Sequence, residues 1–593
     1  MFRTLCFPKA LIRCSVATRA KILSLQNLPD ELLHNVINKL SVYDVMALSP
    51  KSRGIHALCD VNRQKYHQLK FGREKYPQTH EAVLQAGLDT LLAILRTPSL
   101  GHHLRRVDLY GTGMIEFDPD SENSIQDSML SPEDIHRLKQ AILDAGFQDA
   151  QGRESILSML SRNPAKFQSD SSTEALQFKD ALITLLVAAA PNIEFIAMYP
   201  LLEYTRSSSA KNYEKVNLLQ RLLYRAATST ESVPYCQNLR NISFHPDDKL
   251  NESNKYVEDP YYHRLNMVRK LPVIESVAFK LVTWSNEAGI PPPPRSANYS
   301  KVSFTHSIME SWDLCRIIES AKTLKSFTST IGGRLYPEGG NPVLYVTPIF
   351  KSLWTHRQTL EELNLDMESQ TPRQELYDEE YQPRQEDGMT EEDRKDYEEQ
   401  WADELQELAV PEIAPVRVSL KDFPRLKNLS IGAHTLCYLA RGAGDGKKQL
   451  DSKSFNLVDH IPSTLESLRI YGLGEPVDRS TPYLDYEPDI DVDAQIELQA
   501  REKDAKLPGL KILEGVDPCI PNGRTVDEGA DEDDLELFWK DPDDNRFDEV
   551  FLFTPRIKIL MLWPKAVIFG VNPTGPHILV VKSEIFSLIF ALN

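Results

Sequence analysis

A six-residue pattern of hydrophobic and polar positions, apolar-x-x-apolar-x-apolar, recurs along the chain. Full matches begin at Leu104, Ile193, Leu239, Ile274, Tyr299, Leu360, Leu426, Leu465 and Ile557, and matches without the last apolar position begin at Leu324 and Leu510. The last two apolar positions lie two residues apart, so both point to the same side of a strand, and the first lies at the turn that enters it. Each match therefore predicts a short strand with an apolar inner side and a polar outer side.

Helical patterns precede several of these matches. In residues 172–193, Ser172 and Thr173 can cap a helix whose apolar stripe includes Leu182 and Leu185, Pro191 ends it, and the next match follows at once. Residues 308–327 repeat the arrangement. A single strand of this kind cannot bury its inner side alone, whereas stacked strands with return helices form a parallel sheet over one continuous core.

This organisation resembles an irregular leucine-rich-repeat array extending over residues 75–565, with spacings of 25 to 66 residues from Ile193 onwards. The resemblance implies an α/β solenoid with parallel strands on one side and helices on the other. An ordinary α/β protein with leucine-rich strands is the alternative. The recurring polar outward positions favour the solenoid, because strands buried on both faces are typically continuous apolar runs.

The segment LPDELLHNVINKL, residues 28–40, predicts an amphipathic helix. Pro29 suits the first turn, Asp30 and Glu31 favour the positive end of the helix dipole, and the apolar positions from Leu32 to Leu40 fall on one face. Asp44 can cap a second short helix and Arg53 lies in a third. Residues 24–68 are therefore predicted to form a small three-helix module.

This module resembles the F-box, on the strength of Leu28-Pro29, Glu31-Leu32, the apolar helix positions, Asp44-Val45, Leu48 and Arg53. The resemblance implies docking onto the adaptor subunit of a cullin–RING ubiquitin ligase. The implied adaptor-binding residues are Leu28, Pro29, Leu32, Leu33, Val36, Ile37, Leu40, Val45 and Leu48. The interval from Asp44 to Arg53 is shorter than is usual in the family and contains Pro50. The alternative is a helix that caps the end of the repeat array.

Charge is distributed unevenly along the chain. The net charge is −19, of which residues 366–407 contribute −13 and residues 527–549 contribute −10, leaving +4 for the remainder. Such acidic blocks predict two disordered inserts, at 366–412 and 527–549. Residues 1–23 carry five basic residues and no acid, which predicts a disordered basic leader, with mitochondrial targeting a minor alternative. Residues 566–593 lack the repeat pattern and stay unassigned.

The same composition argues against several classes of protein. A nucleic-acid-binding protein needs a concentrated basic face, and no such face is indicated. No apolar run approaches the ~18 residues of a membrane span. Seven sparse cysteines without a C-x-x-C pair indicate reduced thiols in the cytoplasm or nucleus.

Two stretches resemble motifs for chemistry but do not complete them. RGAGDGKKQL (441–450) lacks the spacing of a phosphate-binding loop, and His102-His103 has no metal-ligand partner at suitable spacing. We expect no catalytic, cofactor or metal site. PPPP (291–294) is interpreted as a stiff spacer, with a ligand for a proline-binding domain as the alternative. Residues 390–408 predict an acidic helix that rests one apolar stripe on the array or docks a basic partner.

The sequence therefore predicts the non-enzymatic substrate-recognition subunit of an SCF-type ubiquitin ligase, which acts in ubiquitin-dependent protein degradation. The F-box would hold the adaptor and the repeats would bind an unknown protein target at residues that the sequence does not identify. The alternative is a leucine-rich-repeat interaction scaffold without a ligase role. A hydrolase or nucleotide enzyme with an unrecognised site is the third possibility.

Overall fold

The chain divides into two compact units, Gln68–Leu552 and a unit of Met1–His67 with Phe553–Asn593. The computed structural model describes Leu33 and residues 68–71, 80–109, 130–164, 167, 173–198, 218–229, 233–245, 256–283, 289–332, 343–372, 418–442, 455–473 and 490–523. In the unit of the two chain ends, Leu33 is the described residue. It is helical and buried.

The strands of the described residues form one long sheet in which every neighbouring pair is parallel. Their order across the sheet is chain order, which means that no strand is inserted between earlier ones. These strands are β1 (Gln68–Phe71), β2 (Arg106–Leu109), β3 (Phe195–Met198), β4 (Asn241–Phe244), β6 (Ser276–Lys280), β8 (Lys301–Thr305), β9 (Ser326–Thr330), β10 (Glu362–Asp366), β11 (Asn428–Gly432), β12 (Ser467–Tyr471) and β13 (Ile512–Glu514). A separate parallel pair consists of β5 (Val257–Glu258) and β7 (Val282–Thr283).

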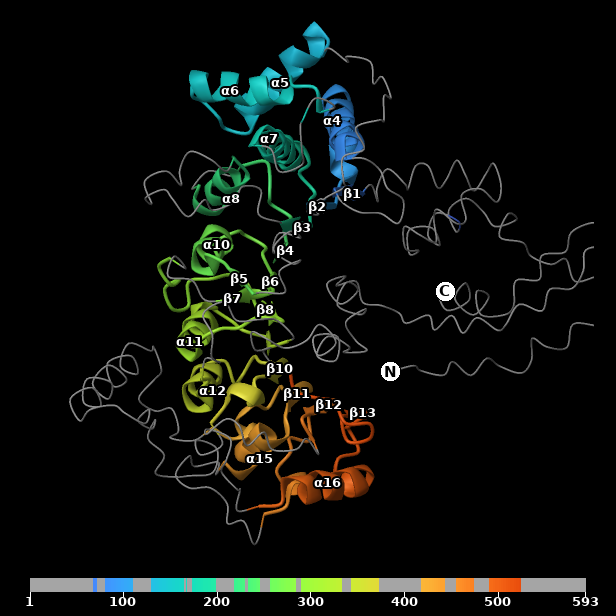
Figure 1. The fold of residues 1–593 in the computed structure, drawn as a ribbon, viewed down its shortest axis with the longest axis vertical. Helices are drawn as coiled ribbons and strands as arrows, with labels where there is room; N and C mark the ends of the chain where they lie inside the picture. The colour runs from blue at the N-terminus through green and yellow to red at the C-terminus, as the bar shows by residue number, and fades with distance from the viewer. Residues whose placement is uncertain are drawn as a thin grey trace, which may run out of the picture. The chain divides into compact units, whose positions relative to one another are not determined.

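Helices fill the crossovers between these strands. They are α4 (His80–Arg96), α5 (Pro132–Asp144), α6 (Ala150–Leu160), α7 (Thr173–Ala189), α8 (Leu218–Thr228), α10 (Tyr261–Val268), α11 (Ser311–Ser320), α12 (Val346–Trp354), α15 (Ala433–Arg441) and α16 (Val492–Lys506), with short 3-10 turns at Pro98–His103, Glu368–Gln370, Leu420–Asp422 and Leu457–Asp459. Figure 1 shows α7, α8, α10, α11, α12 and α15 on the same side of the strands. Crossovers between parallel strands are right-handed, so crossovers that all advance in one direction place their helices on one face.

The hydrophobic pattern explains the position of each strand. All ten matches that fall in the described residues coincide with a strand, and each strand begins two residues after the first apolar position. In β10, for example, Leu360, Leu363 and Leu365 are at most 2% exposed, whereas Asn364 between them is partly exposed. The inward and outward alternation predicted from the sequence is confirmed for this strand.

Aromatic side chains stack in register in the middle of the core. Phe244, Phe279 and Phe304 face one another across β4, β6 and β8, with ring centroids 5.0 and 4.8 Å apart. The ring of Tyr261 in α10 meets Phe304 edge-on at 6.1 Å. Each of these side chains is at most 1% exposed. The α10 helix is thereby packed directly onto the inner face of the sheet.

The fold class is α/β, with a parallel sheet and helices, as the sequence predicts at this coarser level. The predicted helix before Ile193 is α7, which ends at Ala189, next to Pro191 as expected. Asp366, the first residue assigned to the acidic insert, ends β10, and Glu368 and Gln370 are buried in the following turn. The chain up to Pro372 therefore belongs to the folded unit. Several predicted segments lie outside the described residues. They are the remainder of that insert, the second insert, the leader, the helix expected at 390–408 and the match at Ile557.

Candidate binding surface

The side of the sheet opposite the helices is the main surface that the fold offers to a partner. On strands β8 to β13 some of the side chains on this side are partly or fully exposed, and we call that set the outward face; Ser326, Asp366 and Tyr471 on the same side are buried. The outward face consists of Lys301, Ser303, Thr328, Glu362, Asn364, Asn428, Ser430, Ser467, Arg469, Ile512 and Glu514. On β3, β4 and β6 the corresponding positions Ala197, Ser243 and Ala278 are small and buried. The outward face thus combines hydroxyls, amides and charges of both signs, which suits hydrogen bonding to another protein.

Side chains on the outward face are held by contacts between non-adjacent strands. The Tyr471 hydroxyl of β12 donates to Oδ1 of Asn364 in β10 at 3.1 Å. The strand between them, β11, carries Ser430 and Gly432 at the registered positions, and their small size leaves room for the tyrosine to reach across. The guanidinium of Arg469 lies 5.4 Å from the centre of the Tyr471 ring, and its Nε lies 3.8 Å from Glu514 Oε2. This end of the face is therefore pre-ordered.

A return segment, Gly515–Gly523, borders this face at the carboxyl edge of the sheet. After β13 it passes the end of β12, where Gly472 N donates to Ile520 O at 2.7 Å. It then reaches β10, where Gly523 N donates to Asp366 Oδ2 at 2.8 Å and Ser369 Oγ donates to Gly523 O at 2.6 Å. A Cβ atom at position 523 would lie 2.0 Å from the Ile331 carbonyl oxygen, so this close approach requires glycine.

The amino edge of the sheet carries charges that alternate from strand to strand. From β3 to β13, the residue just before each strand of the long sheet donates its backbone N–H to a carbonyl oxygen. That carbonyl belongs to the residue just before the preceding strand. In chain order this column is Arg105, Glu194, Arg240, Glu275, Ser300, Lys325, Glu361, Lys427, Glu466 and Lys511. Ion pairs join Arg105 to Glu194, Arg240 to Glu275 and Lys511 to Glu466. Opposite charges at neighbouring positions stabilise this register, because like charges there would repel.

The signal of this column is present in the sequence, at positions that the hydrophobic pattern leaves out. Its members occupy the second position of each six-residue match, where R, E, R, E, S, K, E, K, E and K follow one another from Leu104 to Leu510. The apolar positions alone do not reveal this alternation.

The contact most like catalytic chemistry lies at the outer side of β4. Ser243 Oγ lies 2.9 Å from Nε2 of His245. Burial, reinforced by Lys280 and Arg106, lowers the pKa of His245 to about 3. A general base works best when its pKa is near the working pH. A histidine with so low a pKa is a poor acceptor for the serine proton, so this pair does not form an effective nucleophile.

Buried polar groups on the helix side have structural roles. His356 follows α12 and accepts a hydrogen bond from Leu324 N at 3.3 Å, while its Nε2 lies 2.9 Å from Ile318 O. Burial lowers its pKa to about 4, so it is neutral at physiological pH. Asp313 of α11 accepts from the Tyr262 hydroxyl of α10 at 2.5 Å. These contacts connect α10, α11 and α12 behind the sheet.

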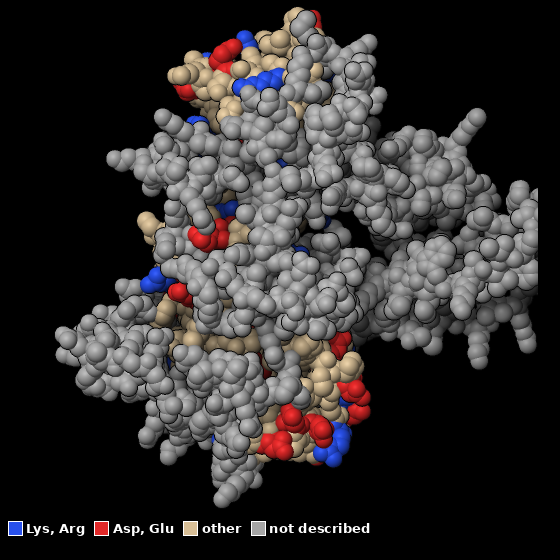
Figure 2. Space-filling view, in the orientation of Figure 1, with Lys and Arg blue, Asp and Glu red and all other residues tan. Residues whose placement is uncertain are grey.

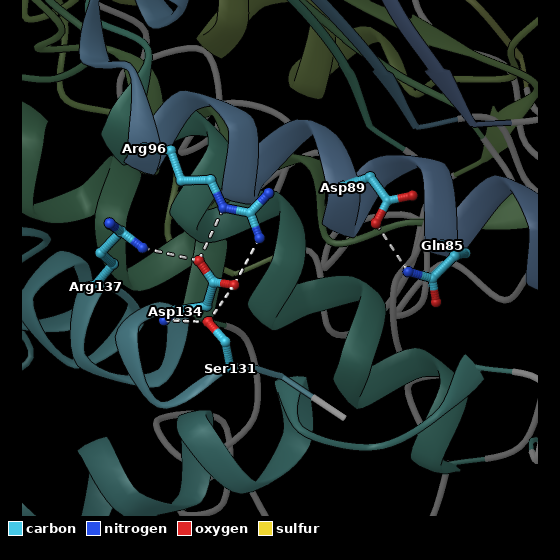
Figure 3. Close-up of polar contacts among 6 residues, drawn as sticks. All are labelled: Gln85, Asp89, Arg96, Ser131, Asp134 and Arg137. Carbon is cyan, nitrogen blue, oxygen red and sulfur yellow. Dashed lines mark hydrogen bonds and ion pairs between the residues drawn. The ribbon is translucent and has the colours of Figure 1, made fainter. Parts of the chain in front are cut away.

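Near the start of this unit, Asp134 joins α5 to α4 (Figure 3). Its carboxylate accepts from Arg96, Arg137 and the capping Ser131. The hydrogen bonds from Arg96 hold the pKa of Asp134 at about 2. A depression beside this cluster is lined by Pro132, Glu133, His136 and Arg137, all from α5. Because a single helix lines it, the depression does not enclose a ligand.

Acidic and basic side chains are also mixed at the other end of the unit. Figure 2 shows both colours side by side over α16. Lys506 there pairs with Asp459 at 2.7 Å and Glu502 at 3.0 Å. This interspersed charge is typical of a solvated surface, and it gives no single-sign patch in this region.

Of the nine residues predicted to bind the ligase adaptor, Leu33 is described. It is 4% exposed in a helix, and the other eight lie outside the described residues. Among the described residues there is no cluster of three or more potential metal ligands, and no helix is long and apolar enough to cross a membrane. The cysteines described, Cys236, Cys315, Cys437 and Cys519, form no disulfide.

No protein-family model matches the chain, and no curated protein matches it significantly.

Proposed function

We propose that the protein is the substrate-recognition subunit of an SCF-type ubiquitin ligase, built as an irregular leucine-rich-repeat solenoid behind an N-terminal F-box. The observation that carries the binding role is the strictly sequential parallel sheet, with helices on one side and a polar outward face on the other. Solenoids use such extended faces to bind proteins. The F-box resemblance of residues 28–53 carries the ligase role.

In this proposal the protein acts by positioning. The F-box holds the ligase adaptor through Leu28, Pro29 and the apolar helix positions, while the outward face holds the target. Tethering raises the effective concentration of target lysines near the conjugating enzyme, and the chemistry of ubiquitin transfer takes place on other subunits.

The second candidate is an interaction scaffold of the same fold without a ligase role. Two observations favour it: no family model matches any part of the chain, and the interval from Asp44 to Arg53 is shorter than in ordinary F-boxes. Both candidates use the outward face, so they differ only at the N-terminal module.

An adaptor pull-down tests the ligase role. The full-length chain is compared with Leu28→Ala/Pro29→Ala and with a matched control, Leu5→Ala/Pro8→Ala, in the basic leader. We expect the wild type and the control to recover the purified adaptor and the Leu28/Pro29 variant to lose most of it. A wild type that recovers no adaptor would leave the scaffold as the better proposal. Equal recovery by both variants would move the docking site away from Leu28 and Pro29.

A further inference from the structure

The loop Gly289–Ala297, between β7 and β8, has a conformation that its sequence dictates. It reads Gly-Ile-Pro-Pro-Pro-Pro-Arg-Ser-Ala. Each proline fixes its own φ near −65°, and each residue that precedes a proline is restricted to extended ψ values. Residues 290–293 all precede a proline, so this stretch favours a polyproline II helix, which has three residues per turn, up to the turn at Pro294 and Arg295.

The exposure of this stretch follows that threefold period. Ile290 and Pro293, one turn apart, are both exposed, and Ile290 is 83% exposed. Pro291 is partly exposed and Pro294, one turn later, is exposed. Pro292, on the third edge, is buried against the body of the protein. One edge of the polyproline helix therefore packs inward, and the two other edges face solvent.

Hydrogen bonds hold both ends of the loop on the helices behind the sheet. Asn266 Nδ2 of α10 donates to Ile290 O at 2.7 Å, and Arg295 N donates to Glu319 O of α11 at 2.8 Å. Ser296 Oγ donates to Pro293 O at 2.6 Å. The exposed edges are thus presented by a loop that is fixed on two helices, and a partner would not have to order it.

A stiff spacer does not account for the exposed isoleucine. The other large hydrophobic side chains described as exposed are Tyr224 (58%), Ile512 (49%) and Val273 (36%). Ile290 exceeds all of them and adjoins the exposed prolines. Domains that recognise polyproline II helices seat two of the three edges in aromatic-lined grooves and benefit from the low entropy of the preformed ligand. Arg295 follows the prolines and is exposed, so it can meet an acidic rim beside such a groove.

We propose that Ile290–Pro294, with Arg295 beside it, is a docking segment for a proline-recognition domain with an aromatic-lined groove, of the SH3, WW or EVH1 kind. The segment lies outside the outward face and is independent of the ligase proposal. It would allow the protein to bind a second partner while the outward face is occupied.

The test is a titration of the full-length protein into three isotope-labelled domains, one each of the SH3, WW and EVH1 kinds, followed by NMR. We expect shifts in the aromatic groove of at least one domain. Ile290→Ser/Pro293→Ala should weaken that binding at least about tenfold, as loss of a central apolar anchor does. Tyr224→Ala, which removes another exposed side chain on α8, should leave the affinity unchanged.

Two further measurements distinguish a loss of docking from a loss of folding. Thermal unfolding of the Ile290/Pro293 variant should match the wild type, because both side chains are exposed, and the peptide GIPPPPRS should displace the protein from the domain. The proposal fails if none of the three domains responds. It also fails if the Ile290/Pro293 variant binds as well as wild type, if Tyr224→Ala weakens binding equally, or if the peptide does not compete.

Discussion

Arg96 at the end of α4 donates two hydrogen bonds to the Asp134 carboxylate of α5, from Nε at 3.0 Å and Nη2 at 2.6 Å. Asp134 is 3% exposed, whereas the arginine side chain is half-exposed. The pair fixes α5 to α4 through a planar, two-pronged contact, the strongest form of charge-assisted hydrogen bond. It joins the first two described α-helices of this unit.

Replacing Asp134 should destabilise the protein in a pH-dependent way. Asp134→Asn removes the charge that Arg96 and Arg137 pair with, and we expect a loss of about 1–2 kcal/mol at pH 7, allowing for solvent screening of Arg96. The pKa of Asp134 is about 2 in the folded protein, below its usual 3.8. Its contribution is therefore fully present above about pH 3.8 and is lost as the pH falls through 2.

Urea unfolding at pH 7, 4 and 3 measures this effect. The gap between wild type and Asp134→Asn should be widest at pH 7 and narrow at pH 3. Asp144→Asn on α5 is the matched control, because Asp144 is exposed and accepts from Gln140. A gap that did not change with pH would show that the carboxylate charge is not what holds the two helices.

Asp180 should behave in the opposite way. Its buried carboxylate in α7 accepts from the N–H groups of Leu218 and Leu219 at 2.7 and 3.2 Å, and so caps α8 from another helix. Burial raises its pKa to about 7. Its stabilising contribution is present below about pH 3.8 and is lost as the pH rises through 7, because the folded state resists ionisation of this group.

Asp180→Asn keeps an acceptor for α8 without the buried charge. We expect it to equal or exceed the wild type in stability at pH 8, with the difference shrinking at pH 5. Asp180→Ala leaves the two N–H groups without that acceptor and should be less stable than Asp180→Asn by about 1–3 kcal/mol at both pH values. Thermal unfolding at pH 5 and 8 compares the three proteins. If Asn were as damaging as Ala at pH 8, the cap would depend on the charge itself.

The central aromatic stack provides a test of packing. Phe279 is fully buried between Phe244 and Phe304. Phe279→Ala should lower the free energy of unfolding by about 3–5 kcal/mol, since it leaves a cavity between two rings, and Phe279→Leu should cost less. Denaturant unfolding gives both values. Equal losses for Ala and Leu would indicate that ring stacking matters more than filled volume.

The strands were predictable because their signal is local and repeated. Leu363 and Leu365 lie on one strand and the turn residue Leu360 comes just before them, so six residues suffice to recognise β10. The return segment could not be predicted in this way. Gly523 meets Asp366 across 157 positions of sequence, and neither residue carries a pattern that points to the other. The proposed docking role of Ile290 depends on the structure for another reason, because the sequence alone does not indicate which edge of the polyproline stretch is buried.

The alternating column at the amino edge lies between these two cases, because its signal is in the sequence but needs the strand register to be recognised.

Glu275 pairs with Arg240 on the preceding strand, and both side chains are about half-exposed. Glu275→Lys would place two positive charges side by side. We expect a loss of about 0.5 kcal/mol at low ionic strength, because exposed pairs contribute little individually. The loss should disappear in 1 M salt, where the Debye length is about 3 Å. Glu497→Lys, the same change at an exposed site on α16, is the control. If both variants lost stability equally, or if the loss at Glu275 persisted in high salt, the alternation of charge would not contribute to the register of the sheet.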